Sequence, residues 1–260
     1  MKLSCSSALL AGAGAHTLEE MVAAAATLGV AGIYLDLPAS NIDPAGFSFR
    51  GSAPLVCVAQ AHAIEWQCLR GAPLTPGQAG QQDETLQRLI CIAHALACPL
   101  VALTAPAHDR GQEFDAAYEA FVAVVQVALD VAQDMDICLA IEPAADTMVR
   151  TADHAVDFVD DVARRNLGII YNPGDPACSG SDEPQQVVSL LKDYLLMVRL
   201  QGADLLAIQR NEFDHAIRLV QRAGFHEYYA DCSPCAPADV PPYILEQLNA
   251  NVRHLRGLIV

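Results

Sequence analysis

Short apolar runs that stop at polar, glycine or proline residues recur along the whole chain. We interpret eight of these runs as strands: residues 2–6, 32–37, 54–60, 99–105, 137–142, 167–172, 195–201 and 227–232. Most of them are apolar throughout rather than alternating, which is typical of strands in a parallel sheet covered by helices. The pattern therefore predicts a parallel sheet with both faces buried.

Between most of these runs, apolar residues recur with helical spacing. The clearest start signal is Thr17-Leu-Glu-Glu20, a capping box that opens an alanine-rich helix closed by Gly29. Further helices are expected within residues 84–98, 114–133, 151–165, 182–194, 212–224 and 241–258. The gap at 38–52 has little helical signal and is expected to be a short or irregular connection.

Alternation of strands and helices over about 250 residues predicts a single (β/α)8 TIM barrel. We expect it to form one domain over residues 1–260, because no linker or low-complexity stretch divides the chain. A doubly wound open sheet is the alternative. No glycine-rich dinucleotide fingerprint follows an early strand, which argues against the Rossmann form of that alternative.

Composition narrows the class of partner. The chain has 31 acidic and 15 basic side chains, and its formal charge of -16 repels nucleic acids and anionic membranes. No run approaches the roughly 20 apolar residues of a membrane span. Nine cysteines are scattered, mostly inside apolar runs, as is typical of reduced, buried thiols. We therefore expect a cytoplasmic protein that binds a small molecule, and a homodimer is compatible with its apolar surface.

In a TIM barrel the active site lies at the carboxyl ends of the strands. The polar or aromatic residues that end or follow the predicted strands are Asp36, His62, Glu65, Trp66, His108, Glu142, Asn172, Asp175, Arg199, Gln201 and Asp231. Glu142 ends the apolar run ICLAIEP, where a buried carboxylate is costly without a partner. Several carboxylates at one face would repel one another unless a cation lies among them.

Three stretches together resemble a known family: TLEEMVAAAATLGVAGIYLDL, ETLQRLICIAHALACPLVAL, and ICLAIEP with the following RTADHAVDFVDDV and NLGIIYNPGD. The family is that of the xylose isomerase-like TIM barrels, the sugar phosphate isomerase/epimerase group. The resemblance implies a divalent metal (Mn, Mg or Zn). Its expected ligands are a glutamate ending strand five, an aspartate ending strand six, a histidine on strand seven and a glutamate on strand eight.

The chain departs from this pattern at three of the four ligand positions. Glu142 matches the first, but Asn172-Pro-Gly-Asp175 stands where the family often has Asp-x-x-His, and Arg199-Leu-Gln201 where it has His-x-Lys. Asp231 is one methylene shorter than the expected glutamate. Because arginine cannot bind a metal ion, only Glu142 and Asp231 are candidate ligands. We expect the guanidinium of Arg199 to be the partner of Glu142 instead.

The resemblance favours an isomerase or epimerase of carbohydrate metabolism, acting on a small sugar or polyol. Abstraction of a proton next to a carbonyl needs a base and an electrophile at the oxygen. Glu142 and Asp231 are the candidate bases and Arg199 the candidate electrophile. Seven residues are expected to contact the substrate: His62, Glu65, Trp66, His108, Asn172, Asp175 and Gln201. A dehydratase using the same enolate chemistry is a close variant.

An alternative of another class is a barrel that keeps its ligand pocket but has lost catalysis and serves as a binding or partner protein. The changes on strands six and seven motivate it. The DNA-repair endonuclease branch of the family is excluded, because it relies on a histidine-rich metal cluster and a basic surface. Cys232-Ser-Pro-Cys235 has the spacing of a redox or metal pair, but we interpret both residues as ordinary loop thiols, since no second such pair exists.

Overall fold

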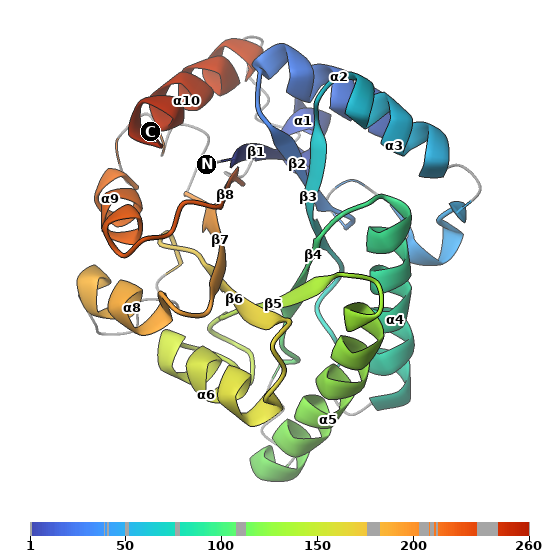
Figure 1. The fold of residues 1–260 in the computed structure, drawn as a ribbon, viewed down its shortest axis with the longest axis vertical. Coiled ribbons are helices and arrows are strands. Elements are labelled where there is room, and N and C mark those ends of the chain that lie inside the picture. Colours follow the sequence, from blue (N-terminus) through green and yellow to red (C-terminus); the bar gives the residue numbers. More distant parts are fainter. Residues whose placement is uncertain are drawn as a thin grey trace.

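Eight parallel strands form a closed barrel in the order β1 to β8, with the helices outside it (Figure 1). The computed structural model describes residues 2–38, 40, 42–49, 52–75, 79–107, 113–175, 183–202, 208, 211, 213–232 and 244–259. The strands are β1 (Lys2–Ser6), β2 (Gly32–Asp36), β3 (Glu65–Arg70), β4 (Leu100–Thr104), β5 (Cys138–Glu142), β6 (Leu167–Tyr171), β7 (Leu195–Leu200) and β8 (Tyr228–Asp231). The ring closes where β8 pairs with β1, which confirms the predicted (β/α)8 barrel.

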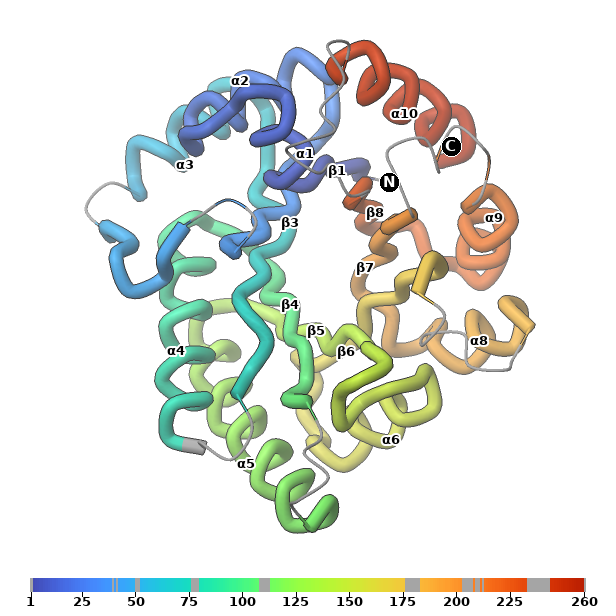
Figure 2. Tube along the Cα trace, turned by 180° about the vertical axis from the view of Figure 1, so that it is seen from behind, coloured from blue at the N-terminus to red at the C-terminus, as the bar shows by residue number. Residues whose placement is uncertain are grey.

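Helices connect the strands and form the outer ring, which Figure 2 shows from the opposite side. They are α1 (Ser7–Gly12), α2 (Leu18–Leu28), α3 (Ser52–Ala61), α4 (Ala79–Ala95), α5 (Phe114–Gln133), α6 (Ala152–Val162), α8 (Pro184–Leu191), α9 (Asp214–Arg222) and α10 (Ile244–Leu258), with a 3-10 turn η1 (Pro44–Gly46). Within the described residues, none of these helices has the length and apolarity to cross a membrane.

Local sequence explains how α2, the predicted alanine-rich helix, begins and ends. The Thr17 side chain accepts a hydrogen bond from the backbone N–H of Glu20, and the Glu20 carboxylate accepts one from the backbone N–H of Thr17. These contacts satisfy N–H groups that have no partner within the helix. Gly29 ends the helix with a φ of 70°, a left-handed conformation that glycine adopts without strain. The capping box is thus confirmed.

The prediction of a strand at 54–60 is wrong, because this segment lies within α3. Leu55 and Ala59, four residues apart, are its buried apolar contacts, and Pro54 lies in the first turn, where it costs no helical hydrogen bond. A short apolar run fits either a strand or the buried face of a helix. The third strand is β3, which begins at Glu65 after the turn that follows α3.

Two apolar layers hold the barrel together. The larger lies between the sheet and the helices. The smaller fills the barrel and consists of Tyr34, Cys68, Leu100, Ala102, Ala140, Ile170, Met197, Ala230 and Cys232. Because side chains alternate along a strand, the next inward positions toward the carboxyl ends of β2, β3, β5 and β7 are Asp36, Arg70, Glu142 and Arg199. Polar residues therefore lie directly above the apolar filling of the barrel.

Candidate active site at the carboxyl ends of the strands

An ion pair between Glu142 and Arg199 lies at the centre of the site. Arg199 Nη1 donates to Glu142 Oε1 at 2.5 Å, and their side chains are only 10% and 6% exposed. The predicted partner of Glu142 is thus confirmed. Burial lowers the pKa of the Arg199 guanidinium, but Tyr34 and Glu142 beside it raise the pKa by more, so the group stays protonated. The Arg199 guanidinium carbon lies 5.7 Å from the centre of the Tyr34 ring.

Asn172 adds a neutral donor to the same carboxylate oxygen. Its Nδ2 donates to Glu142 Oε1 at 3.4 Å, and its Oδ1 accepts from the backbone N–H of Gly174 at 3.1 Å. The second contact fixes which end of the amide faces Glu142. A Cβ at Gly174 would lie 2.1 Å from the backbone oxygen of Gln201, so glycine is needed where the ends of β6 and β7 approach each other.

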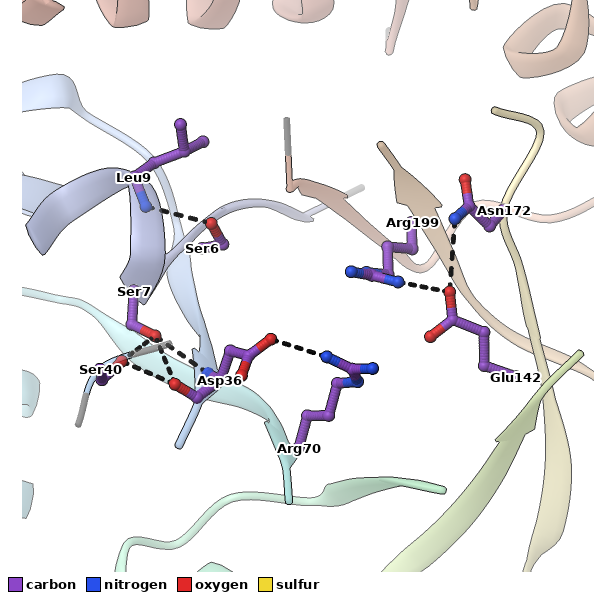
Figure 3. A network of polar contacts seen from close by, with 9 residues as sticks. All are labelled: Ser6, Ser7, Leu9, Asp36, Ser40, Arg70, Glu142, Asn172 and Arg199. Carbon is purple, nitrogen blue, oxygen red and sulfur yellow. Dashed lines mark hydrogen bonds and ion pairs between the residues drawn. The ribbon is translucent and has the colours of Figure 1, made fainter. Parts of the chain in front are cut away.

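A second ion pair, between Asp36 and Arg70, lies opposite the first (Figure 3). Arg70 Nη1 donates to Asp36 Oδ2 at 2.9 Å, with side chains 22% and 11% exposed. The pKa of Arg70 is raised overall. Burial and Arg199 lower it, but Tyr34, Asp36 and Glu142 raise it by more. The Ser7 hydroxyl accepts from the backbone N–H of Asp36 at 2.9 Å, which holds the end of β2 in place.

Asp231 does not point into the barrel, contrary to expectation. It ends β8 at the same edge as Glu142, but it pairs in register with Cys5 and Leu200, whose side chains belong to the layer beneath the helices. Its Oδ2 accepts from Asn251 Nδ2 of α10 at 3.1 Å, and both residues are buried. Asp231 therefore connects the barrel to α10 and does not converge with Glu142.

Cys232 occupies the inward position that the prediction gave to Asp231. Its side chain belongs to the barrel filling, as do those of Ala230 and Met197. Burial raises the pKa of its thiol to about 12, and Arg199 partly opposes this rise. Cys235, which we interpret with Cys232 as an ordinary loop thiol, lies outside the described residues. The seven cysteines that the structure describes are all free thiols.

The three residues assigned to the end of the third strand lie elsewhere, because that strand was misplaced. His62 is exposed in the turn before β3. Glu65 is the first residue of β3 and accepts from Lys2 Nζ at 2.7 Å, and Lys2 is the first residue of β1. Trp66 is buried between sheet and helices. Glu65 and Trp66 are thus at the amino end of the barrel, away from Glu142, and the placement of all three at the site was wrong.

The remaining predicted contacts lie at or near the expected edge. Asp175 follows β6, where its backbone N–H donates to the Asn172 carbonyl, and it is half-buried. Gln201 follows β7 directly and is also half-buried. His108 lies outside the described residues. Arg70 is the member of the site that the sequence interpretation missed. The signal was present, since the run WQCLR is followed by Gly71 and Pro73, a typical end of a strand.

The donor set at this edge does not fit a divalent cation. The inward residues of β5, β7 and the ends of β6 and β8 are Glu142, Arg199, Asn172 and Cys232, so they include one carboxylate and a fixed positive charge that is paired with it. Hard cations require several oxygen ligands and are repelled by a guanidinium. Within the described residues, no group of three or more His, Cys, Asp or Glu side chains is placed to hold a metal ion.

Comparison with known proteins agrees with the fold. A sequence profile described as "Xylose isomerase-like TIM barrel" matches residues 22–215. A D-psicose 3-epimerase from Clostridium cellulolyticum H10, crystallised with D-tagatose, has a TM-score of 0.82 at 13% identity, over 100% of this chain and 99% of that one.

Two other solved structures are similar over nearly their whole length. The IolI protein with a bound zinc atom has a TM-score of 0.75 at 13% identity, over 100% of this chain and 98% of that one. The probable 3-DHS dehydratase AsbF from Bacillus anthracis has a TM-score of 0.74 at 12% identity, over 98% of this chain and 99% of that one. No curated protein sequence matches. At these identities the structural likeness establishes the fold alone.

Proposed function

The chain belongs to the xylose isomerase-like TIM barrel family, and we propose that it is a sugar isomerase or epimerase in which Arg199 is the electrophile at the substrate oxygen. The observation that carries the proposal is the buried Arg199–Glu142 pair at the carboxyl ends of the strands. It places a carboxylate and a strong hydrogen-bond donor side by side, the two groups that proton transfer next to a carbonyl requires.

Glu142 is the base in this proposal. Arg199 and Asn172 both donate to Oε1, whereas the other oxygen, Oε2, turns toward Arg70 in Figure 3. Oε2 takes the proton from the carbon next to the substrate carbonyl, while an Arg199 N–H stabilises the developing negative charge on the carbonyl oxygen. The hydroxyl proton on the neighbouring carbon passes to the former carbonyl oxygen of the enediolate. Return of the first proton from Oε2 to that neighbouring carbon then completes an aldose–ketose isomerisation with one carboxylate base.

Isomerisation is favoured over epimerisation by the position of Asp231. Inversion at a single carbon requires a proton to leave one face of the substrate and return to the other, which a single fixed base cannot do alone. Asp231, the second candidate base, is directed toward Asn251 on α10 and away from Glu142. A dehydratase that uses the same enolate remains the close chemical variant.

The test is deuterium exchange. The protein is incubated in D2O with a set of aldoses and ketoses, with and without chelator or added manganese, and proton NMR follows exchange next to the carbonyl. We expect exchange that is insensitive to chelator and that falls about 100-fold or more in Glu142→Gln. Asp231→Asn is the matched control, because the same chemical change is made at the same edge but outside the lumen.

A second candidate function rests on the two donors to Glu142. Both donors bind the same oxygen of Glu142, so half of the carboxylate is already engaged within the protein, which suits a barrel that binds a sugar without turning it over. Saturable binding of a sugar with no exchange would favour this second function. Equal exchange in Glu142→Gln and the unmodified protein would overturn the proposed role of Glu142.

A further inference from the structure

Two guanidinium groups face the same space from opposite walls of the barrel. Arg70 comes from β3 and Arg199 from β7, which are four strands apart in the closed ring of eight. Figure 3 shows each arginine beside its carboxylate partner, with its guanidinium group turned toward the other ion pair. Arg199 and Glu142 lie near enough to Arg70 to affect it, since Arg199 lowers the pKa of Arg70 and Glu142 raises it. One carboxylate holds each arginine in place.

Three buried groups that can donate hydrogen bonds lie in the lumen without a partner among the described residues. Arg70 Nε, Arg199 Nε and the Tyr34 hydroxyl are buried and have no hydrogen-bond partner within the described structure. The residue Arg199 is only 8% exposed and Tyr34 is fully buried. Buried polar groups in folded proteins are nearly always paired, and each unpaired one costs about 1–3 kcal/mol. Three such donors around one space indicate that an acceptor-rich group belongs there.

We propose that Arg70 and the Nε–H of Arg199 together bind a carboxylate group of the substrate, while another N–H of Arg199 serves the carbonyl oxygen, so that the substrate is a sugar acid and not a neutral sugar. Guanidinium forks match the two oxygens of a carboxylate, and hydrogen bonds to an ionised acceptor are the stronger kind. Asp36 and Glu142 fix the arginine heads and offset their charge before the substrate arrives. The inference deepens the proposed function, on which it rests for the choice of a sugar as the ligand.

Charge balance separates a carboxylate from a phosphate. The two arginines and two carboxylates of the ion pairs sum to zero. A carboxylate adds one negative charge to this neutral set, and three unpaired donors can share it. A phosphate dianion adds nearly two negative charges beside Glu142 and Asp36, and the two ion pairs contain no additional positive charge to offset them.

The test measures binding by calorimetry, independently of deuterium exchange. The sugar-acid proposal can therefore fail while the proposed isomerase function holds, and the isomerase function can fail while sugar acids still bind. Hexuronates and aldonates are compared with neutral sugars and sugar 6-phosphates of the same configuration, for example D-glucuronate with D-glucose and glucose 6-phosphate. We expect at least one sugar acid to bind about ten-fold or more tightly than both counterparts. This comparison needs no variant, so a folding defect cannot obscure it.

Arg70→Lys then assigns the binding to the arginine. Lysine keeps the charge that Asp36 needs but loses the planar fork, so the ratio of affinities for the sugar acid and the neutral sugar should fall about ten-fold. Arg164→Lys is the control, because Arg164 pairs with Asp130 on the outer surface. Equal or tighter binding of neutral or phosphorylated sugars, no binding of any sugar acid, or an unchanged preference in Arg70→Lys would each overturn the proposal.

Discussion

Replacing Arg199 with methionine is expected to destabilise the fold because it leaves Glu142 charged and buried. The Glu142 side chain is 6% exposed, and its other donor in the described structure is the Asn172 amide at 3.4 Å, a long hydrogen bond. Removing one partner of a buried ion pair typically costs about 3–5 kcal/mol, since the remaining charge has lost both water and its counterion. We expect Arg199→Met to lose a free energy of unfolding in that range.

The double change Arg199→Met with Glu142→Leu separates this effect from lost packing. Replacing a whole buried pair with apolar residues of similar volume is often neutral or stabilising. The double variant should therefore recover most of the loss, and the coupling energy between the two positions should exceed about 2 kcal/mol. The exposed pair of Arg164 and Asp130 is the control and should show little coupling, because both side chains stay hydrated.

Urea unfolding is the assay, and Trp66 is its probe. It is the single tryptophan of the chain and is 2% exposed, so its fluorescence reports loss of the packing between sheet and helices. The transition followed by fluorescence must coincide with that followed by circular dichroism for the free energies to be comparable. If Arg199→Met costs under about 1 kcal/mol, or if the double variant is as unstable as the single one, Glu142 does not depend on Arg199.

Asp231→Ala should lower the melting temperature, because it leaves the buried Asn251 amide without this acceptor, whereas deuterium exchange should persist; loss of exchange with intact stability would contradict the outward orientation. Iodoacetamide at pH 8 should modify the exposed Cys57 but leave Cys232 unmodified until the protein unfolds, since burial raises the pKa of the Cys232 thiol to about 12; peptide mass analysis decides this. Asn172→Asp combined with Arg199→His should bind zinc that the unmodified protein does not retain through dialysis, and elemental analysis showing stoichiometric metal at Glu142 in the unmodified protein would contradict the fit argument.

The fold was predictable because parallel strands are buried on both faces and so form unbroken apolar runs. Residues 137–142 and 167–172 were identified on that basis alone, and the helices between strands carried caps and helical spacing. The pattern failed at 54–60 and at β3. In α3 the buried apolar positions are too few to show a helical period, so the segment resembles a strand. β3 begins with an exposed Glu65 and contains Gln67, so it lacks the unbroken apolar run expected of a buried strand.

The site was predictable only as far as position along the strand determines it. Glu142 and Arg199 end apolar runs and both face inward. Asp231 ends a run as well, but it lies one residue out of phase with Cys232, and a polar residue can be buried outside the barrel when a helix supplies a partner such as Asn251. That partner comes from α10, and no property of β8 alone indicates it. The sheet also has register shifts at Ile33/Tyr34 and Ile169/Ile170. Because of them, the inward-facing positions of one strand do not predict those of the neighbouring strand.

The guanidinium of Arg199 on β7 gives the site a positive charge that does not depend on a bound ion. A bound cation supplies positive charge only while metal is available and its ligands are deprotonated. Arg199 supplies that charge from the chain itself, and its pKa lies above the already high value of a free guanidinium, so the charge is present at every physiological pH. Asn172 fits the same logic, because its Nδ2–H donates to Glu142 where a second carboxylate would repel it. Asn172 and Arg199 thus act together: both donate to Glu142, and folding alone puts the positive charge of Arg199 in place beside it.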